Sequence, residues 1–313
     1  MRATLITALL ASLALAGCTG DDTVRIAFVA KDTATAPAED LDALADHISE
    51  ATGLDVSIHY FTSSTAALAA LKAGQADIAS VDGAAGWLAW KELGLEAFGS
   101  ETRSDGRTHY MASGWVRADS DIQTVADLAG KNSCHTGATK SAGMFMPMGY
   151  LTKEGLIDWS GYPDDISQVQ EGAKAFFDNA QIGGGIYDGY EGALRCLSDG
   201  TGDVAFVRDT TPADYCGEDA KEWCLELADY RELVQFGAVP EHPFMVGPHV
   251  PTTTLDKVSA VLFDLHETDA GAALLDAVFG TDAIVHVDTE THLGQYGGLL
   301  DLLPGGSGYA SSK

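Results

Sequence analysis

Positive charge is scarce in this sequence of 313 residues. Only 18 residues are Lys or Arg, against 46 Asp and Glu, so the formal net charge is -28 at pH 7. A protein that binds nucleic acid needs a basic surface to neutralise phosphate groups. The composition therefore excludes nucleic acid as a general partner.

Long apolar runs are absent after the N-terminus, so we expect no transmembrane helix in the rest of the chain. The one apolar stretch, Leu5–Ala16, follows Arg2 and is too short to span a bilayer comfortably. A basic residue before a short apolar run is typical of a secretory signal peptide, which we assign to residues 1–17.

The segment around Cys18 indicates how the mature protein begins. Leu15-Ala16-Gly17-Cys18 resembles a lipoprotein signal, in which the Cys is lipidated and becomes the new N-terminus. The alternative is an ordinary signal peptide followed by an incidental Cys. We expect residues 18–21 to be a lipidated tether that holds the protein outside the cytoplasm, at the cell surface or in the periplasm.

Cysteines are few: the chain has five, and four remain when Cys18 is left out. An even number outside the cytoplasm indicates two disulfides, for which three pairings are possible. We favour Cys134–Cys196 and Cys216–Cys224, because the second closes a short local loop. Cys134-His135 could suggest a thiol nucleophile with its base, but neighbours on a strand face opposite ways.

Nucleotide-binding glycine fingerprints are missing too. Gly183-Gly184-Gly185 has no Lys-Ser/Thr after it, so it indicates a flexible turn rather than a phosphate-binding loop.

Strand-like and helix-like segments alternate along the chain. Alternating apolar and polar residues, or short apolar runs, predict strands, and apolar residues at helical spacing predict helices. In the first part we expect strands at Thr23–Ala30, Asp55–Phe61 and Asp77–Val81, and helices at Ala38–Thr52, Ser64–Ala73 and Gly83–Leu93. This order predicts a mostly parallel sheet covered by helices.

The later part of the chain continues the α/β pattern. We expect strands at Tyr110–Arg117 and Asp203–Val207, extended chain at Leu233–Gly247, and helices at Ser141–Glu154, Tyr190–Ser198, Thr254–His266 and Ala270–Phe279. Pro147 is expected to kink the first of these helices. We expect no regular structure in Gly294–Lys313.

The pattern predicts a two-domain binding protein whose hinge is crossed twice. One subdomain would comprise residues 22–108 and 246–313, and the other residues 109–245. The ligand cleft would lie at strand ends and helix N-termini, where α/β sheets usually bind ligands. The phrase Lys72–Ala79 (KAGQADIA) resembles solute-binding proteins of ABC importers.

Two segments carry a more specific resemblance. Asn132–Gly149 reads NSCHTGATKSAGMFMPMG, and Tyr187–Val207 reads YDGYEGALRCLSDGTGDVAFV. Both are similar to transferrins: the first to their anion-binding segment and the second to a stretch that carries an iron-binding Tyr. The resemblance implies a two-subdomain fold of the type II periplasmic-binding-protein class, like one transferrin lobe, with a two-strand hinge.

The resemblance also implies a set of ferric-iron ligands: Asp82, Tyr110, Tyr190 and His242. Fe³⁺ is a hard cation that favours anionic oxygen ligands. A bound cation can remove the proton of a Tyr, so two phenolates, a carboxylate and a neutral imidazole would suit it. In transferrins carbonate fills the remaining coordination positions, and we therefore expect Fe³⁺ with carbonate as cargo.

The anion would be held by Thr136, Lys140, Ser141, Ala142 and Gly143. A hydroxyl donor and a helix N-terminus both attract anions. This sequence departs from the transferrin pattern at Lys140, where the family typically has Arg. Lys offers a point charge in place of a bidentate fork, so carbonate would bind more weakly or with looser anion choice.

Each proposed ligand also has an ordinary interpretation. A lone Asp82 is usually a turn or a helix cap, a lone Tyr110 or Tyr190 a packed aromatic, and a lone His242 beside a Pro a loop residue. All four residues fall at the positions that the transferrin pattern gives them, and this agreement favours iron binding. We therefore expect a monomer that takes up iron and hands it to a membrane permease or receptor. We do not expect an enzyme.

Two other functions stay open. The main alternative is a solute-binding protein of an ABC importer for phosphate, phosphite or phosphonate, without metal. A third is a secreted enzyme with a metal-bound water and Glu191 or Glu241 as base. We also expect Asp209 and Asp214 to have surface roles, and Arg208 to bridge the closed cleft to Glu290.

Overall fold

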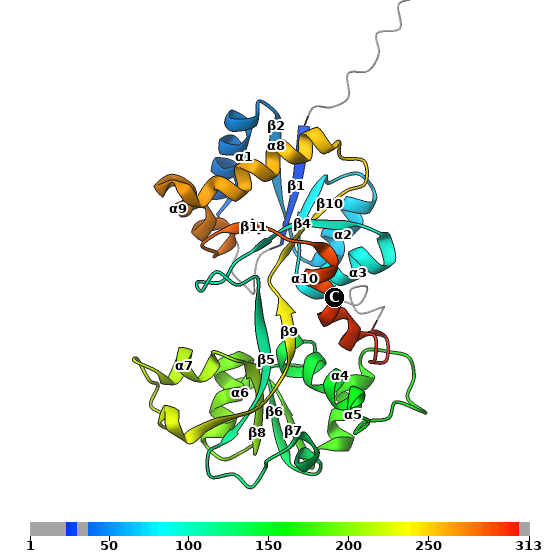
Figure 1. The fold of residues 1–313 in the computed structure, drawn as a ribbon, viewed down its shortest axis with the longest axis vertical. Helices are drawn as coiled ribbons and strands as arrows, with labels where there is room; N and C mark the ends of the chain where they lie inside the picture. Colours follow the sequence, from blue (N-terminus) through cyan, green and yellow to red (C-terminus); the bar gives the residue numbers. More distant parts are fainter. Residues whose placement is uncertain (1–22, 30–36, 307–313) are drawn as a thin grey trace, which may run out of the picture.

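The computed structural model describes residues 23–29 and 37–306. The predicted signal peptide and the predicted lipidation site, Cys18, lie outside this range. The chain forms two lobes, each with a β-sheet flanked by helices (Figure 1). Within the described ranges, none of the helices is long and apolar enough to cross a membrane.

The first lobe contains a sheet of six strands. Their order is β11 (Ile284–His286), β4 (Glu96–Glu101), β10 (Pro243–Val246), β3 (Ile78–Ser80), β1 (Thr23–Val29) and β2 (Asp55–Phe61). β1 is parallel to β2 and β3, as predicted. The expectation of a mostly parallel sheet is wrong for the other half, because β10 returns from the second lobe and pairs antiparallel with β3 and β4, and β11 with β4.

Helices cover both faces of this sheet. They are α1 (Ala38–Thr52), α2 (Ser64–Lys72), α3 (Gly83–Leu93), α8 (Thr252–Asp264) and α9 (Asp269–Phe279). α1 shows why they pack there: Leu41, Leu44, Ala45 and Ile48 recur at helical spacing and are all buried. The helix ends at Gly53, whose left-handed backbone suits a residue without a side chain.

The second lobe contains a sheet of five strands. Their order is β7 (Asn179–Ile182), β6 (Asn132–His135), β8 (Val204–Arg208), β5 (His109–Arg117) and β9 (Tyr230–Pro240). The helices here are α4 (Met146–Lys153), α5 (Gln168–Phe176), α6 (Gly189–Ser198) and α7 (Thr211–Cys216). A π-helical turn, η2 (Ser141–Phe145), precedes α4, so the expected single helix changes geometry just before Pro147.

The chain crosses between the lobes twice. Residues 102–108 join β4 to β5, and Glu241 and His242 join β9 to β10. β5 and β9 pair with each other, with His109 opposite Pro240 at the end nearest the first lobe (Figure 1). The two-sheet α/β fold with a two-strand connection is therefore as predicted.

The C-terminal helix α10 (Thr289–Leu300) was not predicted. The expectation of irregular chain from Gly294 is wrong as far as Leu300, because α10 packs against α3 of one lobe and α4 and β9 of the other (Figure 1). The last residues of the predicted irregular segment, 307–313, lie outside the described range. Glycines lower intrinsic helix propensity, which obscured it. At Gly297 the glycine permits close packing, because a Cβ there would lie 2.2 Å from the Trp87 ring.

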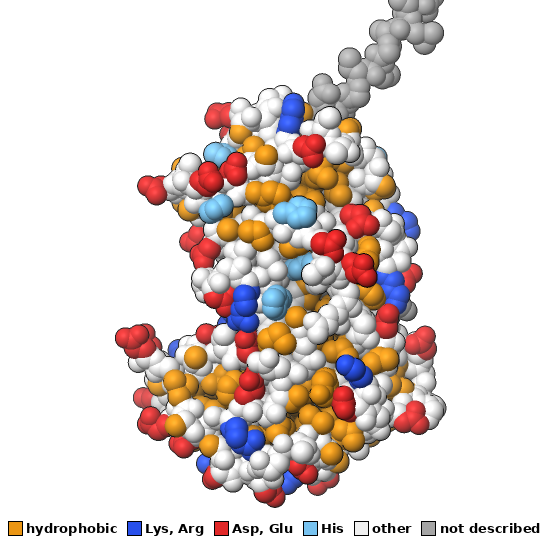
Figure 2. Space-filling model, viewed as in Figure 1, with side chains coloured by type: hydrophobic (Ala, Val, Ile, Leu, Met, Phe, Trp, Pro, Cys, Tyr) orange, Lys and Arg blue, Asp and Glu red, His pale blue; other side chains and the backbone are white. Residues whose placement is uncertain are grey.

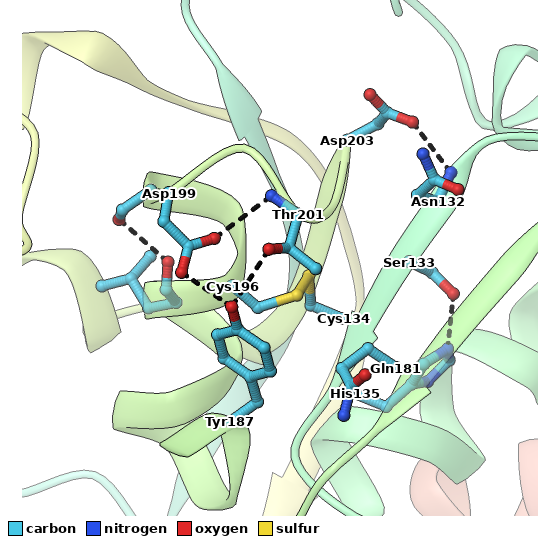
Figure 3. The surroundings of a disulfide bond; sticks show 12 residues. Asn132, Ser133, Cys134, His135, Gln181, Tyr187, Cys196, Asp199, Thr201 and Asp203 are labelled. Carbon is cyan, nitrogen blue, oxygen red and sulfur yellow. Dashed lines mark hydrogen bonds between the residues drawn. A yellow bond between two sulfur atoms is a disulfide. The ribbon is translucent and has the colours of Figure 1, made fainter. Parts of the chain in front are cut away.

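Both predicted disulfides are present. Cys134–Cys196 joins β6 to α6, and Cys216–Cys224 closes the loop after α7. Figure 3 shows the first of them beside Tyr187, whose hydroxyl donates to Asp199 at 2.9 Å. This disulfide joins two elements of the second lobe: the strand that leads into Thr136 and the helix that carries Tyr190.

Candidate anion and metal site

A pair of tyrosines lies at the centre of the candidate site. Tyr110 is the second residue of β5 and Tyr190 the second residue of α6. The Tyr190 hydroxyl donates to the Tyr110 hydroxyl at 3.2 Å, and the two rings are perpendicular. The fold thus brings together two residues that are 80 positions apart.

Two arginines lie over these rings. The guanidinium of Arg103 is 5.6 Å from the centre of the Tyr110 ring, and that of Arg208 is 4.8 Å from the centre of the Tyr190 ring. Such contacts attract a cation to the electron-rich face of the ring. Both arginines are also ion-paired, Arg103 with Glu241 at 3.1 Å and Arg208 with Asp214 at 3.0 Å.

These ion pairs bear on two predictions. Arg208, the last residue of β8, contacts Asp214 on α7, six positions later. The bridge from Arg208 to Glu290 across a closed cleft stays a prediction. Asp209 does not have a simple surface role: it pairs with Arg107 at 3.2 Å and accepts from the backbone N–H of Met111.

The surroundings keep both tyrosines protonated. Burial raises the pKa of Tyr110 well above its usual range, and neighbouring Tyr190 and Glu241 raise it further. Burial also raises the pKa of Tyr190, although the hydrogen bond to Tyr110 and the charge of Arg208 oppose it. Both residues are therefore neutral phenols at neutral pH unless a cation displaces their protons.

Asp82 lies just after β3 and caps α3. One carboxylate oxygen accepts from the backbone N–H of Ala85 at 3.0 Å, and the other from the Ser64 hydroxyl at 2.8 Å. The ordinary capping interpretation is therefore correct. A Cβ on Gly83 would lie 2.6 Å from the Pro240 ring, so α3 begins directly against the second crossing.

His242 lies within the second crossing. Its Nδ1 is 3.8 Å from a carboxylate oxygen of Glu101, which is itself buried, and the Glu101 N–H donates to the His242 carbonyl. In the described part of the chain, no group of three or more His, Cys, Asp or Glu is placed to hold a metal. The predicted iron ligands are a different kind of set, because two of the four are tyrosines.

The anion segment follows β6. The hydroxyl of Thr136 is buried and has no hydrogen-bond partner among the residues that the structure describes. Gly143 packs directly against it: a Cβ on Gly143 would lie 1.9 Å from that hydroxyl oxygen and 2.6 Å from the Thr136 backbone nitrogen. Only glycine fits at position 143, and Thr136 is left with a donor that a bound oxygen would satisfy.

His135 fixes the position of Gly143. It is fully buried, and its Nδ1 lies 2.7 Å from the Gly143 carbonyl while its Nε2 lies 2.8 Å from the Ser133 hydroxyl. Burial lowers the pKa of His135 to about 4, so the ring is neutral at neutral pH. The neutral ring therefore donates through Nδ1–H to the Gly143 carbonyl. It accepts from the Ser133 hydroxyl at Nε2, the contact drawn in Figure 3.

The helix that begins at Ser141 supplies further donors. Its first backbone N–H groups have no partner within the helix, and its dipole favours an anion at this end. Ala142 and Gly143 are buried in the first turn, whereas Lys140 is exposed and has extended backbone. Thr136 and the helix start together form a place for an oxyanion.

Tyr296 belongs to this site and was missed by sequence reasoning. Its hydroxyl lies 2.8 Å from the Ser141 hydroxyl, and the side chain is buried on α10. Burial raises its pKa, and the negative charge of Asp82 raises it further, although the hydrogen bond to Ser141 opposes the rise. The apolar spacing Leu293, Tyr296 and Leu300 would have indicated this helix and its buried face.

The surface view shows where the lobes meet. On the face in Figure 2 the molecule is hollowed on one side between the lobes, and basic and histidine side chains lie beside this hollow. Acidic side chains are spread over the rest of the face.

The family is established by a direct match. A family model for the periplasmic substrate-binding protein of ABC phosphonate transporters matches residues 26–292. The chain belongs to this family. Its members are solute-binding proteins that serve a membrane transporter rather than enzymes, and Glu241, one of the two bases considered for hydrolysis, is engaged by Arg103.

The chain is also similar to transferrins. It is 32% identical to ovotransferrin of Gallus gallus over 186 residues, which cover 51% of this chain and 26% of ovotransferrin. It is 32% identical to serotransferrin of Oryzias latipes over 244 residues, which cover 67% of this chain and 34% of that protein. The chain thus spans about a quarter to a third of the length of these relatives.

Solved structures share the fold. XAC2383 from Xanthomonas citri bound to chloride ion superimposes with a TM-score of 0.64 at 16% identity, covering 90% of this chain and 98% of that protein. A binding protein component of an ABC phosphonate transporter from Pseudomonas aeruginosa gives a TM-score of 0.56 at 13% identity, covering 90% and 86%. The transferrin-like periplasmic-binding fold is therefore shown.

Proposed function

We propose that this protein is the extracytoplasmic solute-binding component of an ABC importer and that it binds an oxyanion of the phosphate, phosphite or phosphonate class. The observation that carries the proposal is the buried Thr136 hydroxyl without a hydrogen-bond partner, at the start of the helix that contains Gly143. Leaving a buried donor unpaired costs about 1–3 kcal/mol, which a bound anion oxygen would recover.

The ligand would be held by groups from one lobe and enclosed by the other. Oxygens of the anion would accept from Thr136, from Ser141 and from the free N–H groups of the helix start. Asp82 lies across the junction on the first lobe. Its carboxylate can only accept a hydrogen bond, so closure about the two crossings would add a contact to a protonated oxygen of the ligand. Lipidation of Cys18 would keep the protein beside its permease.

Ferric ion with carbonate is the second candidate ligand. The specific observation in its favour is the tyrosine pair, whose hydroxyls are 3.2 Å apart. Fe³⁺ would displace their protons and bind both phenolates, with Asp82 and His242 completing the protein ligands. Carbonate would then occupy the Thr136–Gly143 segment, and the similarity to transferrins supports this assignment.

One titration series separates the two ligands. Metal-free protein would be titrated with phosphate, phosphite and methylphosphonate by calorimetry, and with ferric salt by absorbance in the presence and absence of bicarbonate. Heat of binding without metal supports the oxyanion importer. A bicarbonate-dependent phenolate-to-iron absorption band supports the ferric candidate. If neither ligand binds, both proposals are wrong.

A further inference from the structure

Tyr296 links the anion segment to the C-terminal helix. The Tyr296 and Ser141 hydroxyls are 2.8 Å apart, which is the length of a good O–H···O hydrogen bond. Ser141 is the first residue of η2, and Tyr296 comes from α10, 155 positions later. The bond therefore joins the start of the anion helix to an element that packs on both lobes.

The direction of this bond matters for the ligand. When two hydroxyls face each other, only one of them donates its proton into the bond between them. The other hydroxyl accepts, and its own proton can be donated to another acceptor. Tyr296 is almost fully buried, at 1% exposure, within an apolar cluster that includes Phe145, Leu293 and Leu300. Ser141 is only partly buried and lies at the helix end that faces the anion segment.

The phenol is the better donor of the two. A phenol is more acidic than an aliphatic hydroxyl, yet its ordinary pKa of about 10 keeps it protonated at neutral pH, and burial raises the pKa of Tyr296 further. When Tyr296 donates to Ser141, the proton of Ser141 is free to point elsewhere. The contact thus leaves Ser141 as a second hydroxyl donor in the segment that contains Thr136.

We propose that Tyr296 is a positioning residue of the anion site: it donates to the Ser141 hydroxyl, which in turn donates to the bound oxyanion. This inference rests on the proposed anion-binding function and deepens it. The chain of donors runs from α10 through Ser141 to the ligand. Because α10 contacts α3, which begins after Asp82, the same bond couples anion binding to the opposite lobe.

The test uses a double-mutant cycle in the full-length protein. Tyr296→Phe, Ser141→Ala and the double variant would be titrated with methylphosphonate and with inorganic phosphate by calorimetry, and their unfolding by urea would be followed. One neutral hydrogen bond corresponds to about a five- to tenfold change in affinity. We expect Tyr296→Phe to lose that factor when Ser141 is present and to lose nothing further in the Ser141→Ala background.

A matched control is available in the same lobe. Tyr230 is also buried, and its hydroxyl lies 2.5 Å from the hydroxyl of Ser198, away from the anion segment. Tyr230→Phe removes a tyrosine–serine bond together with the bond from the Leu225 N–H, and it should leave the affinity unchanged. Equal losses of affinity in Tyr296→Phe and Tyr230→Phe would overturn the inference.

The outcomes also distinguish this inference from the proposed function. If the wild-type protein binds neither anion, the proposed function fails. If it binds them and Thr136→Val weakens binding while Tyr296→Phe does not, this inference alone is overturned. A ¹⁹F resonance from 3-fluorotyrosine placed at position 296 provides a second measurement that needs no deletion of the hydroxyl: it should shift on addition of anion, and an unchanged resonance in protein that binds would contradict us.

Discussion

At the scale of single residues, the site depends on close packing between particular side chains, which the composition does not reveal. Thr136 and Gly143 are seven positions apart, yet the hydroxyl of one occupies the space that a side chain on the other would need. The resemblance to transferrins identified both residues as an anion segment. It could not show that the Thr136 hydroxyl lacks a partner, since this depends on the packing of β6 against the following helix.

Gly143→Ala tests this fit. The added Cβ would overlap the Thr136 oxygen at 1.9 Å, so Thr136 or the helix must move. We expect a loss of about 1–3 kcal/mol in the free energy of unfolding, as for other overpacked positions, together with loss of anion binding. Urea denaturation and calorimetry would measure both.

The matched control for this change is Gly298→Ala. Gly298 is on α10, and a Cβ there meets nothing within 4 Å. Alanine should be neutral or stabilise the helix by up to about 1 kcal/mol, with unchanged binding. Wild-type affinity in Gly143→Ala would show that the segment does not form the anion site.

At the scale of elements, periodicity predicted most helices and strands of the first lobe with nearly correct limits. It failed where the fold compensates for poor local propensity. α10 contains Gly294, Gly297 and Gly298, yet it forms because its apolar side chains enter the core shared by the two lobes. Because we expected this segment to be irregular, we also missed Tyr296. The helix and the site residue were missed for the same reason, the low helix propensity of the glycines.

The last residue of the short strand β6, His135, supports the anion segment in a way that depends on pH. The pKa of His135 in the folded protein is about 4, below the ordinary value of 6.5. A histidine with a lowered folded pKa contributes stability above the unfolded pKa, and that contribution is lost as pH falls toward the folded pKa. We expect it to disappear between about pH 6.5 and 4, a difference of about 3 kcal/mol at most.

His135→Asn would measure this contribution, because its amide can still donate to Gly143 but does not titrate. The free energy of unfolding by urea would be compared at pH 7 and pH 4.5. The wild-type protein should lose more stability on acidification than the variant does. His266→Gln, at an exposed position outside the anion segment, serves as control. An equal loss in wild type and His135→Asn would refute this account.

At the scale of the whole molecule, two lobes are joined by two crossings and by a helix that packs on both. The sequence predicted the α/β class and the two-strand connection from the order of its segments and from the transferrin resemblance. It did not predict the antiparallel half of the first sheet, because strand direction there is set by how the chain returns from the second lobe. The ligand set of Asp82, Tyr110, Tyr190 and His242 stays a prediction.

The two disulfides should differ in their effect on global stability. Cys134–Cys196 closes a loop of 62 positions and Cys216–Cys224 one of 8. Loop-closure entropy predicts losses of about 4 and about 2.5 kcal/mol when each pair is changed to serine. Chemical denaturation of the two double variants would test this order, and a larger loss for the short loop would contradict it.

The central claim is that the unpartnered hydroxyl of Thr136 binds an oxygen of the ligand. The most direct measurement compares the anion affinity of Thr136→Val with that of Thr211→Val by calorimetry. Thr211 is a matched control, since its hydroxyl is also buried and unpartnered but lies on α7. We predict at least about a tenfold loss of affinity in Thr136→Val, since a hydrogen bond to a charged group contributes about 1.5–3 kcal/mol, and wild-type affinity in Thr211→Val. Equal affinities in the two variants would contradict the account.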